Sequence, residues 1–296
     1  MGGRPCPFPP QMSKDQFKQL AADLWSAGDN LRANSDHKSS GHATPARLDK
    51  DADDAVDQAL EFAAQGDFAK GEKLLVGLLA GNSDLYILHF GMGTLLAMRG
   101  DTAESIPYFD RCLEMFPYHV EAWFNKGMAH RKLFDVRGSV AAFKKVADFG
   151  DDEDSFVTEA REILGGIEAA IHEDSGLSMD QYFRNEDKFD QAFRDMENNR
   201  FVEALAGFQE VLRMNPSHAQ SHGNSALCHA FLGRQPEALA AIDRALEIDP
   251  DYEPALRNRE VVRSLKEGEK LPAGQMQVVE HYKNVVEKER DGNPNG

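Results

Sequence analysis

Residues 86–150 contain two consecutive copies of one repeat, from which the fold can be predicted. It reads YILHFGMGTLLAMRGDTAESIPYFDRCLEMFPYH over 86–119 and VEAWFNKGMAHRKLFDVRGSVAAFKKVADFG over 120–150. The two parts align without a gap, so the period is 34 residues. Further copies of the same length occupy 52–85, 185–218 and 219–252, the last two starting 65 and 99 residues after residue 120. Self-similarity at a fixed period of this length predicts a solenoid of stacked helical units.

Several positions within the period hold only certain residue types. Positions 8 and 20 are small, which lets two helices cross closely, and position 24 is bulky and apolar, which fills the space between layers. Proline at position 32 (Pro117, Pro216 and Pro250) ends the second helix, because the residue before a proline avoids the helical region. Position 8 holds Ala59, Gly93, Gly127, Ala192 and Ala226, position 20 holds Gly71, Ser105, Ser139, Ala204 and Ala238, and position 24 holds Leu75, Phe109, Phe143, Phe208 and Ile242.

This combination of small, bulky and proline positions resembles the tetratricopeptide-repeat (TPR) family over about residues 52–153 and 185–267. Gly66-Asp67, Gly100-Asp101 and Gly233-Arg234 fit the turn between the two helices of a repeat, and Asn198-Asn199 takes the same place in another copy. The resemblance implies an all-α, right-handed superhelix of antiparallel helix pairs. It also implies a non-catalytic scaffold for protein–protein interaction.

The pattern predicts a series of segments along the chain. Three repeats occupy 52–153, two more occupy 185–252, and a capping helix follows at 253–267. Residues 154–184 form either a degenerate repeat or a joint, so the solenoid has two lobes meeting near 173–178 or is one superhelix of altered twist. The tail 268–296 contains an amphipathic helix at about 276–290, which packs on the solenoid end or contacts a partner.

The first fifty residues do not fit the period. One helix is expected at about 14–32, and the composition of the remainder predicts disorder. Residues 13–45 resemble the N-terminal helical segment of the modification (DNA methylase) subunits of type I restriction systems. That resemblance implies an alternative function, as an accessory or regulatory protein of DNA restriction–modification. The family's glycine-rich loop and Asn-Pro-Pro-aromatic motif are missing, so methylation does not follow. The matching residues are Leu24, Trp25, Asp29, Leu31, Arg32, Ala33, Asn34, Ser35, Lys38, Ser39, Ser40, Thr44 and Pro45.

The charge, hydropathy and cysteine content of the chain limit the kinds of partner and the cellular compartment that we expect. The 33 basic and 50 acidic residues give a net charge of −17, which repels phosphate backbones and argues against nucleic acid. No apolar run is long enough to span a membrane, and the N-terminus lacks a signal-peptide core. The three cysteines do not form a disulfide framework. These features predict a cytoplasmic protein.

The sequence contains only weak indications of metal binding or catalysis. His218, His222, Cys228 and His229 suggest a metal site at first sight, but His218 falls in a repeat turn and the others face different ways. No nucleophile elbow, P-loop or zinc-protease motif occurs. We therefore expect no catalysis, no cofactor and no bound metal.

In TPR proteins the first helix of each repeat lines the concave face, and the corresponding positions here are rather apolar. Apolar anchors of a peptide or protein fit such a groove, and Glu121, Glu186, Asp190 and Glu197 favour basic flanks on the ligand. The positions that clamp chaperone C-terminal tails in one TPR subfamily lack the required Lys and Arg, so those tails are disfavoured. Alternatively, these side chains pack within their own repeats. The predicted groove residues are Val56, Leu60, Phe90, Thr94, Met98, Phe124, Asn125, Met128, Phe189, Phe193, Asn224 and Phe231.

Overall fold

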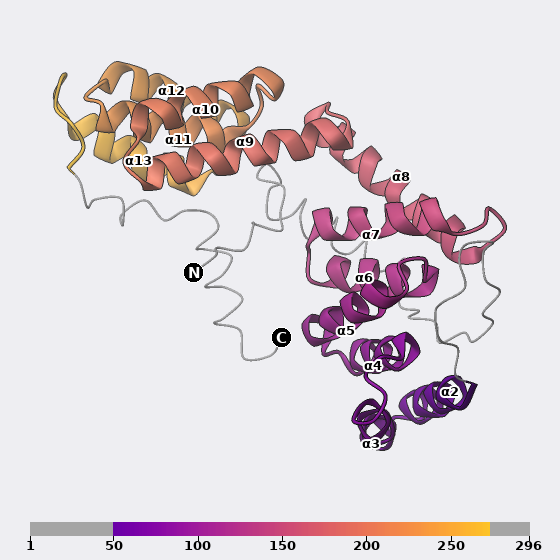
Figure 1. Cartoon of the computed structure of the whole chain (residues 1–296). Helices are drawn as coiled ribbons and strands as arrows, with labels where there is room; N and C mark the ends of the chain where they lie inside the picture. The colour runs from indigo at the N-terminus through magenta and orange to yellow at the C-terminus, as the bar shows by residue number, and fades with distance from the viewer. Residues whose placement is uncertain (1–49, 273–296) are drawn as a thin grey trace. The chain divides into compact units, whose positions relative to one another are not determined.

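A computed structural model describes residues 50–272, which form twelve α-helices and no strands (Figure 1). The predicted all-α fold is therefore confirmed over this range. The helices expected at about 14–32 and 276–290 lie outside the described residues. The helices are α2 (Lys50–Ala64), α3 (Phe68–Leu79), α4 (Tyr86–Arg99), α5 (Thr102–Met115), α6 (Val120–Lys132), α7 (Val136–Phe149), α8 (Ser155–Ser175), α9 (Met179–Glu197), α10 (Phe201–Met214), α11 (Ala219–Phe231), α12 (Gln235–Ile248) and α13 (Glu253–Ser264).

The described residues divide into two compact units, 50–167 and 168–272, which we call the first unit and the second unit. In the first unit, α2 pairs with α3, α4 with α5, and α6 with α7. In the second unit, α9 pairs with α10 and α11 with α12, and α13 packs on α12. The first helix of each pair is called helix A below, and the second helix B.

The restricted positions of the repeat meet in the core of each pair. A Cβ added at Gly93 would lie 2.8 Å from the ring of Phe109, and one at Gly127 would lie 2.9 Å from the ring of Phe143. Position 8 is therefore small because the position 24 side chain of the same repeat lies directly over it. A Cβ added at Gly71 would lie 2.6 Å from the Ala59 carbonyl oxygen, so positions 8 and 20 mark the closest approach of the two helices.

A residue in the left-handed region of backbone space ends helix A in each repeat. Gly100 has φ +99°, and Asn199 has φ +60° in one of the two copies that lack glycine at this place. Both residue types tolerate this conformation. The third repeat keeps this backbone conformation but has neither residue type, because Phe134 adopts φ +58°. A bulky residue there is strained, which the sequence pattern did not indicate.

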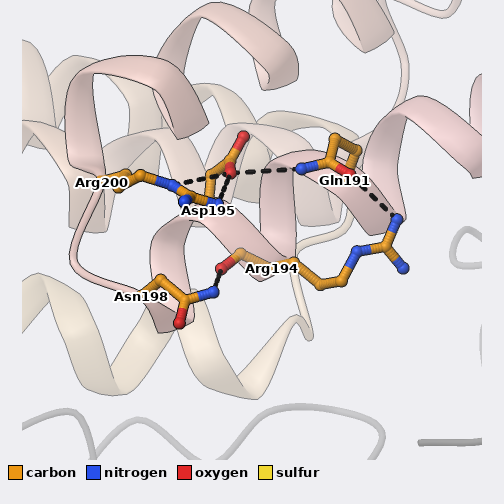
Figure 2. A network of polar contacts seen from close by, with 5 residues as sticks. All are labelled: Gln191, Arg194, Asp195, Asn198 and Arg200. Carbon is orange, nitrogen blue, oxygen red and sulfur yellow. Dashed lines mark hydrogen bonds and ion pairs between the residues drawn. The ribbon is translucent and has the colours of Figure 1, made fainter. Parts of the chain in front are cut away.

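The turn between α9 and α10 replaces glycine with a polar network, which Figure 2 shows from close by. Arg200 donates from Nε to Asp195 Oδ1 at 3.1 Å, and Gln191 Nε2 donates to the same oxygen at 3.2 Å. Asn198 Nδ2 caps the Arg194 carbonyl at 2.7 Å. These bonds satisfy polar groups at the end of a helix whose turn is made by two asparagines.

Residues 154–184 do not contain a helix pair. The single 21-residue helix α8 occupies most of the segment and crosses the boundary between the units at 167–168. It ends at Ser175, before Gly176 with φ +70°. A capping box then opens α9, with Gln181 N donating to Ser178 Oγ at 3.4 Å and Ser178 N donating to Gln181 Oε1 at 2.9 Å.

The last described residues return to the preceding repeat. After α13 ends at Ser264, Gly268 N donates to the Gly233 carbonyl at 3.2 Å, and Leu271 N donates to the Ala230 carbonyl at 3.1 Å. Leu271 is buried. This segment, 265–272, closes the α11–α12 turn, which the sequence did not predict because it lies beyond the repeat.

Candidate partner-binding site

The predicted groove residues lie on helices A, but most of them belong to the core. Ten of the twelve are no more than 6% exposed, and Met98 and Phe193 are the two that remain partly exposed. Packing between repeats accounts for this burial. The buried ten are Val56, Leu60, Phe90, Thr94, Phe124, Asn125, Met128, Phe189, Asn224 and Phe231.

Phe124 illustrates how a helix A position becomes interior. Its ring centroid lies 5.5 Å from that of Phe143 in the same repeat and 5.0 Å from that of Phe156 at the start of α8. It therefore joins two successive layers and is 1% exposed. Val56 has a similar role, because a Cβ added at Gly91 would lie 2.8 Å from its side chain.

Two of the buried phenylalanines, Phe90 and Phe189, pack against histidine N-caps that the repeat pattern did not predict. His119 caps α6, with Ala122 N donating to its Nδ1 at 3.2 Å, and its ring stacks on Phe90 at 4.6 Å. His218 caps α11 in the same way, with Ser221 N donating to its Nδ1 at 3.1 Å, and its ring lies 5.2 Å from that of Phe189. The signal was the string Pro-x-His at positions 32–34 of both repeats.

The cap places a neutral imidazole deep in the second unit. Because Nδ1 accepts a hydrogen bond, the proton resides on Nε2, which is buried without a partner. Burial lowers the pKa of His218 from 6.5 to about 3, and the nearby His222 lowers it further. His222 itself bonds the Pro216 carbonyl through Nε2 at 3.1 Å. These histidines thus have structural partners.

Two asparagines occupy the same position, 6, of an A helix, with one asparagine in each unit. Asn125 Nδ2 donates to Thr94 Oγ1 at 3.3 Å, which ties α6 to α4, while its Oδ1 is buried without a hydrogen-bond partner. Asn224 is 5% exposed, and its Nδ2 has no hydrogen-bond partner either. Unpaired buried polar atoms are uncommon and call for a physical explanation.

Several carboxylates of the first unit interact electrostatically near the start of helix α6. Glu121, at the start of α6, is partly buried, and desolvation raises its pKa to about 8, with the charges of Asp154 and Asp57 raising it further. Tyr86 belongs to the same neighbourhood. Burial raises its pKa to about 12, and Asp53 and Glu121 add to the effect.

Nucleophilic and metal-binding groups are not assembled in the described part of the chain. Burial raises the pKa of the Cys112 thiol, and it raises that of Cys228 to about 12, so neither thiol ionises near neutral pH. Over residues 50–272, no three His, Cys, Asp or Glu side chains converge as metal ligands. In the same range, no helix is both long and apolar enough to cross a membrane.

The tetratricopeptide-repeat family model matches residues 56–120, 90–154 and 189–253, which together make up more than half of the chain. With the helix pairs and their packed positions, this match shows the class. The chain belongs to the tetratricopeptide-repeat family, whose members are in general non-enzymatic scaffolds for protein interaction. The resemblance of residues 13–45 to restriction-system subunits lies outside the described residues and stays a prediction.

Among known proteins, the chain is similar to an Hsp70-Hsp90 organizing protein of Triticum aestivum, with 25% identity over 145 residues, 46% of this chain and 23% of the relative. It is also similar to trafficking protein particle complex subunit 12 of Mus musculus, with 34% identity over 62 residues, 21% of this chain and 8% of the relative. The chain thus spans less than a quarter of the length of either relative.

Solved structures with a similar arrangement are also TPR proteins. One is YrrB, described as having an unusual peptide-binding site, at 18% identity and a TM-score of 0.34, covering 63% of this chain and 97% of YrrB. Another is the TPR2AB domain of yeast Sti1 in a complex with pHSP90, at 17% identity and a TM-score of 0.37, covering 72% of this chain and 83% of that one.

Proposed function

We propose that this chain is a non-catalytic scaffold that holds a partner peptide or protein against the A helices of its repeats. The observation that carries the proposal is that, within each unit, helix pairs of one family are stacked with their A helices adjacent, as in the Thr94–Asn125 hydrogen bond between α4 and α6. Preformed surfaces of this kind bind without a large ordering cost.

The accessible apolar contacts are fewer than the sequence indicated. Met98 at the end of α4 and Phe193 on α9 are partly exposed, and Phe193 stacks on the buried Phe189 with ring centroids 6.4 Å apart. We propose each of these side chains as an anchor for an apolar group of the partner, held in place by the buried cluster of its own unit. The curated relatives and Sti1 support a protein or peptide as the partner class.

The test compares partner capture by the wild type with capture by Met98→Glu/Phe193→Glu. A matched control is Val76→Glu/Val202→Glu, because these valines are 52% and 60% exposed and lie on the B helices α3 and α10. Loss of partners from the first variant alone supports the A-helix site. Equal retention or equal loss in both variants overturns it.

The restriction–modification alternative concerns residues 13–45, and it is tested separately by removing residues 1–49. Loss of a restriction-complex partner from that truncated chain would support it. An unchanged set of partners would remove its basis.

A further inference from the structure

We propose that the first unit contains a subsite for a cationic side chain, the ammonium of a lysine or the guanidinium of an arginine, centred on Glu121 and Asn125. The subsite rests on the proposed scaffold function, because it assigns the chemistry of one residue of the partner. Its polarity is the reverse of a site that grips a carboxylate.

The first element of the subsite is a group of carboxylates from three parts of the unit. Glu121 begins α6, Asp57 lies on α2, and Asp154 precedes α8. The close packing of Gly91 against Val56 brings α2 to α4 next to Asp57, and the Thr94–Asn125 bond brings α4 to α6. The charges of Asp57 and Asp154 both act on Glu121 and raise its pKa.

The second element is an acceptor that the fold leaves unpaired. Asn125 is 1% exposed, and its Oδ1 has no hydrogen-bond partner. It lies four residues after Glu121 on the same helix, so the two side chains share one face of α6. A buried acceptor without a donor costs free energy that an N–H of a ligand would recover. The Asn125 amide oxygen accepts hydrogen bonds, and so does the Glu121 carboxylate once it ionises, so a ligand that binds both groups has to donate them.

Cations of the first unit do not supply this donor to Glu121. Lys126 pairs with Asp110 on α5 and lies 5.1 Å from the centroid of the Trp123 ring. Arg131, further along α6, interacts electrostatically with Glu159 on α8, whose charge acts to raise the pKa of Arg131. Among the described residues, Glu121 forms no ion pair and no hydrogen bond through its side chain. An external cation therefore has a carboxylate and an amide oxygen to bind.

An organic cation fits these groups better than a metal ion. Calcium requires six to eight oxygen ligands and magnesium a near-ideal octahedron, whereas ammonium and guanidinium groups bind through three to five N–H donors. Tyr86, which responds to the charges of Asp53 and Glu121, adds an aromatic ring to the neighbourhood. Lysine and arginine share this chemistry, and the planar guanidinium differs in offering paired donors.

The test begins with selection of random peptides displayed on phage, using the full chain. We expect the wild type to enrich peptides that contain Lys or Arg. A selected peptide is then synthesised with Lys, Arg or uncharged norleucine at the basic position, and binding is measured by fluorescence anisotropy. Norleucine should weaken binding to the wild type about tenfold to hundredfold, as expected for loss of charge-assisted hydrogen bonds.

Glu121→Gln is the informative variant, and Glu104→Gln on the exposed surface of α5 is its matched control. In Glu121→Gln the preference for the cation should fall to about threefold or less, while Glu104→Gln keeps the wild-type preference. Peptides whose affinity changes with neither norleucine nor Glu121→Gln would overturn the subsite and leave the scaffold proposal standing. If the wild type selects no peptide and captures no partner, both proposals fail.

Discussion

Acidification should weaken the second unit through one buried histidine. His218 is 0% exposed and caps α11 through a neutral Nδ1, so protonation breaks the cap and places a charge in the core. Its pKa is lowered from 6.5 to about 3 in the fold. The unfolded chain therefore binds a proton more readily than the folded one. The resulting stability is present above pH 6.5 and is lost as pH falls toward 3.

The size of the effect follows from the two pKa values. Between pH 7 and pH 5, the difference in proton binding lowers the free energy of unfolding by about 2 kcal/mol. His218→Asn is the matched variant, because asparagine is a good N-cap and has no imidazole to protonate. It should be less stable than the wild type at pH 7, since it loses the contact with Phe189. Its stability should nevertheless depend less on pH.

The assay is urea unfolding of the full chain, followed by far-UV circular dichroism at pH 7, 6 and 5. We expect the wild type to lose about 2 kcal/mol more than His218→Asn over this range. His222 and His229, whose pKa values are also lowered by burial, are present in both proteins and cancel in the comparison. Parallel losses in the two proteins would contradict this prediction, because they would show that His218 is not a buried neutral cap.

Three further perturbations test other features. Because the pKa of Glu121 is raised from 4.5 to about 8, stability should fall as pH rises from about 5 to 8. Glu121→Gln should gain about 2 kcal/mol at pH 8 in urea unfolding, less than the ~5 of the full shift because the group is partly exposed; an equal midpoint would contradict this. Gly100→Ala should lower the free energy of unfolding by about 1 kcal/mol, because Gly100 has φ +99°. Gly166→Ala inside α8, where no atom lies within contact distance of an added Cβ, should raise it by about 0.5–1 kcal/mol. Thermal unfolding distinguishes the two opposite effects. Cys112 and Cys228 are fully buried, so a maleimide should label them only after unfolding, and labelling of native protein would show that the core opens.

The helix pairs could be predicted from the sequence because the residue types at fixed positions of the repeat indicate where the two helices pack. Small residues at position 8 and bulky ones at position 24 have meaning only when two helices cross, and Gly93 and Phe109 meet as that reading requires. The capping box at Ser178 can also be recognised from the sequence, because both of its hydrogen bonds join residues three apart. Local chemistry and short-range packing are what a single sequence records best.

The accessible site could not be predicted in the same way, because exposure depends on neighbouring repeats. Phe124 occupies a position that lines the groove of other family members, but Phe156 of α8 lies against it here. The histidine caps were missed because histidine is not among the preferred N-cap residues. Helix α8 continues through Gly165 and Gly166, a pair that ordinarily indicates a break.

The Pro-x-His ending of residues 216–218 also has a use beyond this chain. A solenoid's stability is close to a sum over its repeats and their nearest-neighbour contacts. A three-residue cassette that makes one junction acid-labile should therefore be transferable to engineered repeat arrays, together with the phenylalanine under the ring. The number of cassettes would then set the pH at which such an array comes apart, independently of what the array binds.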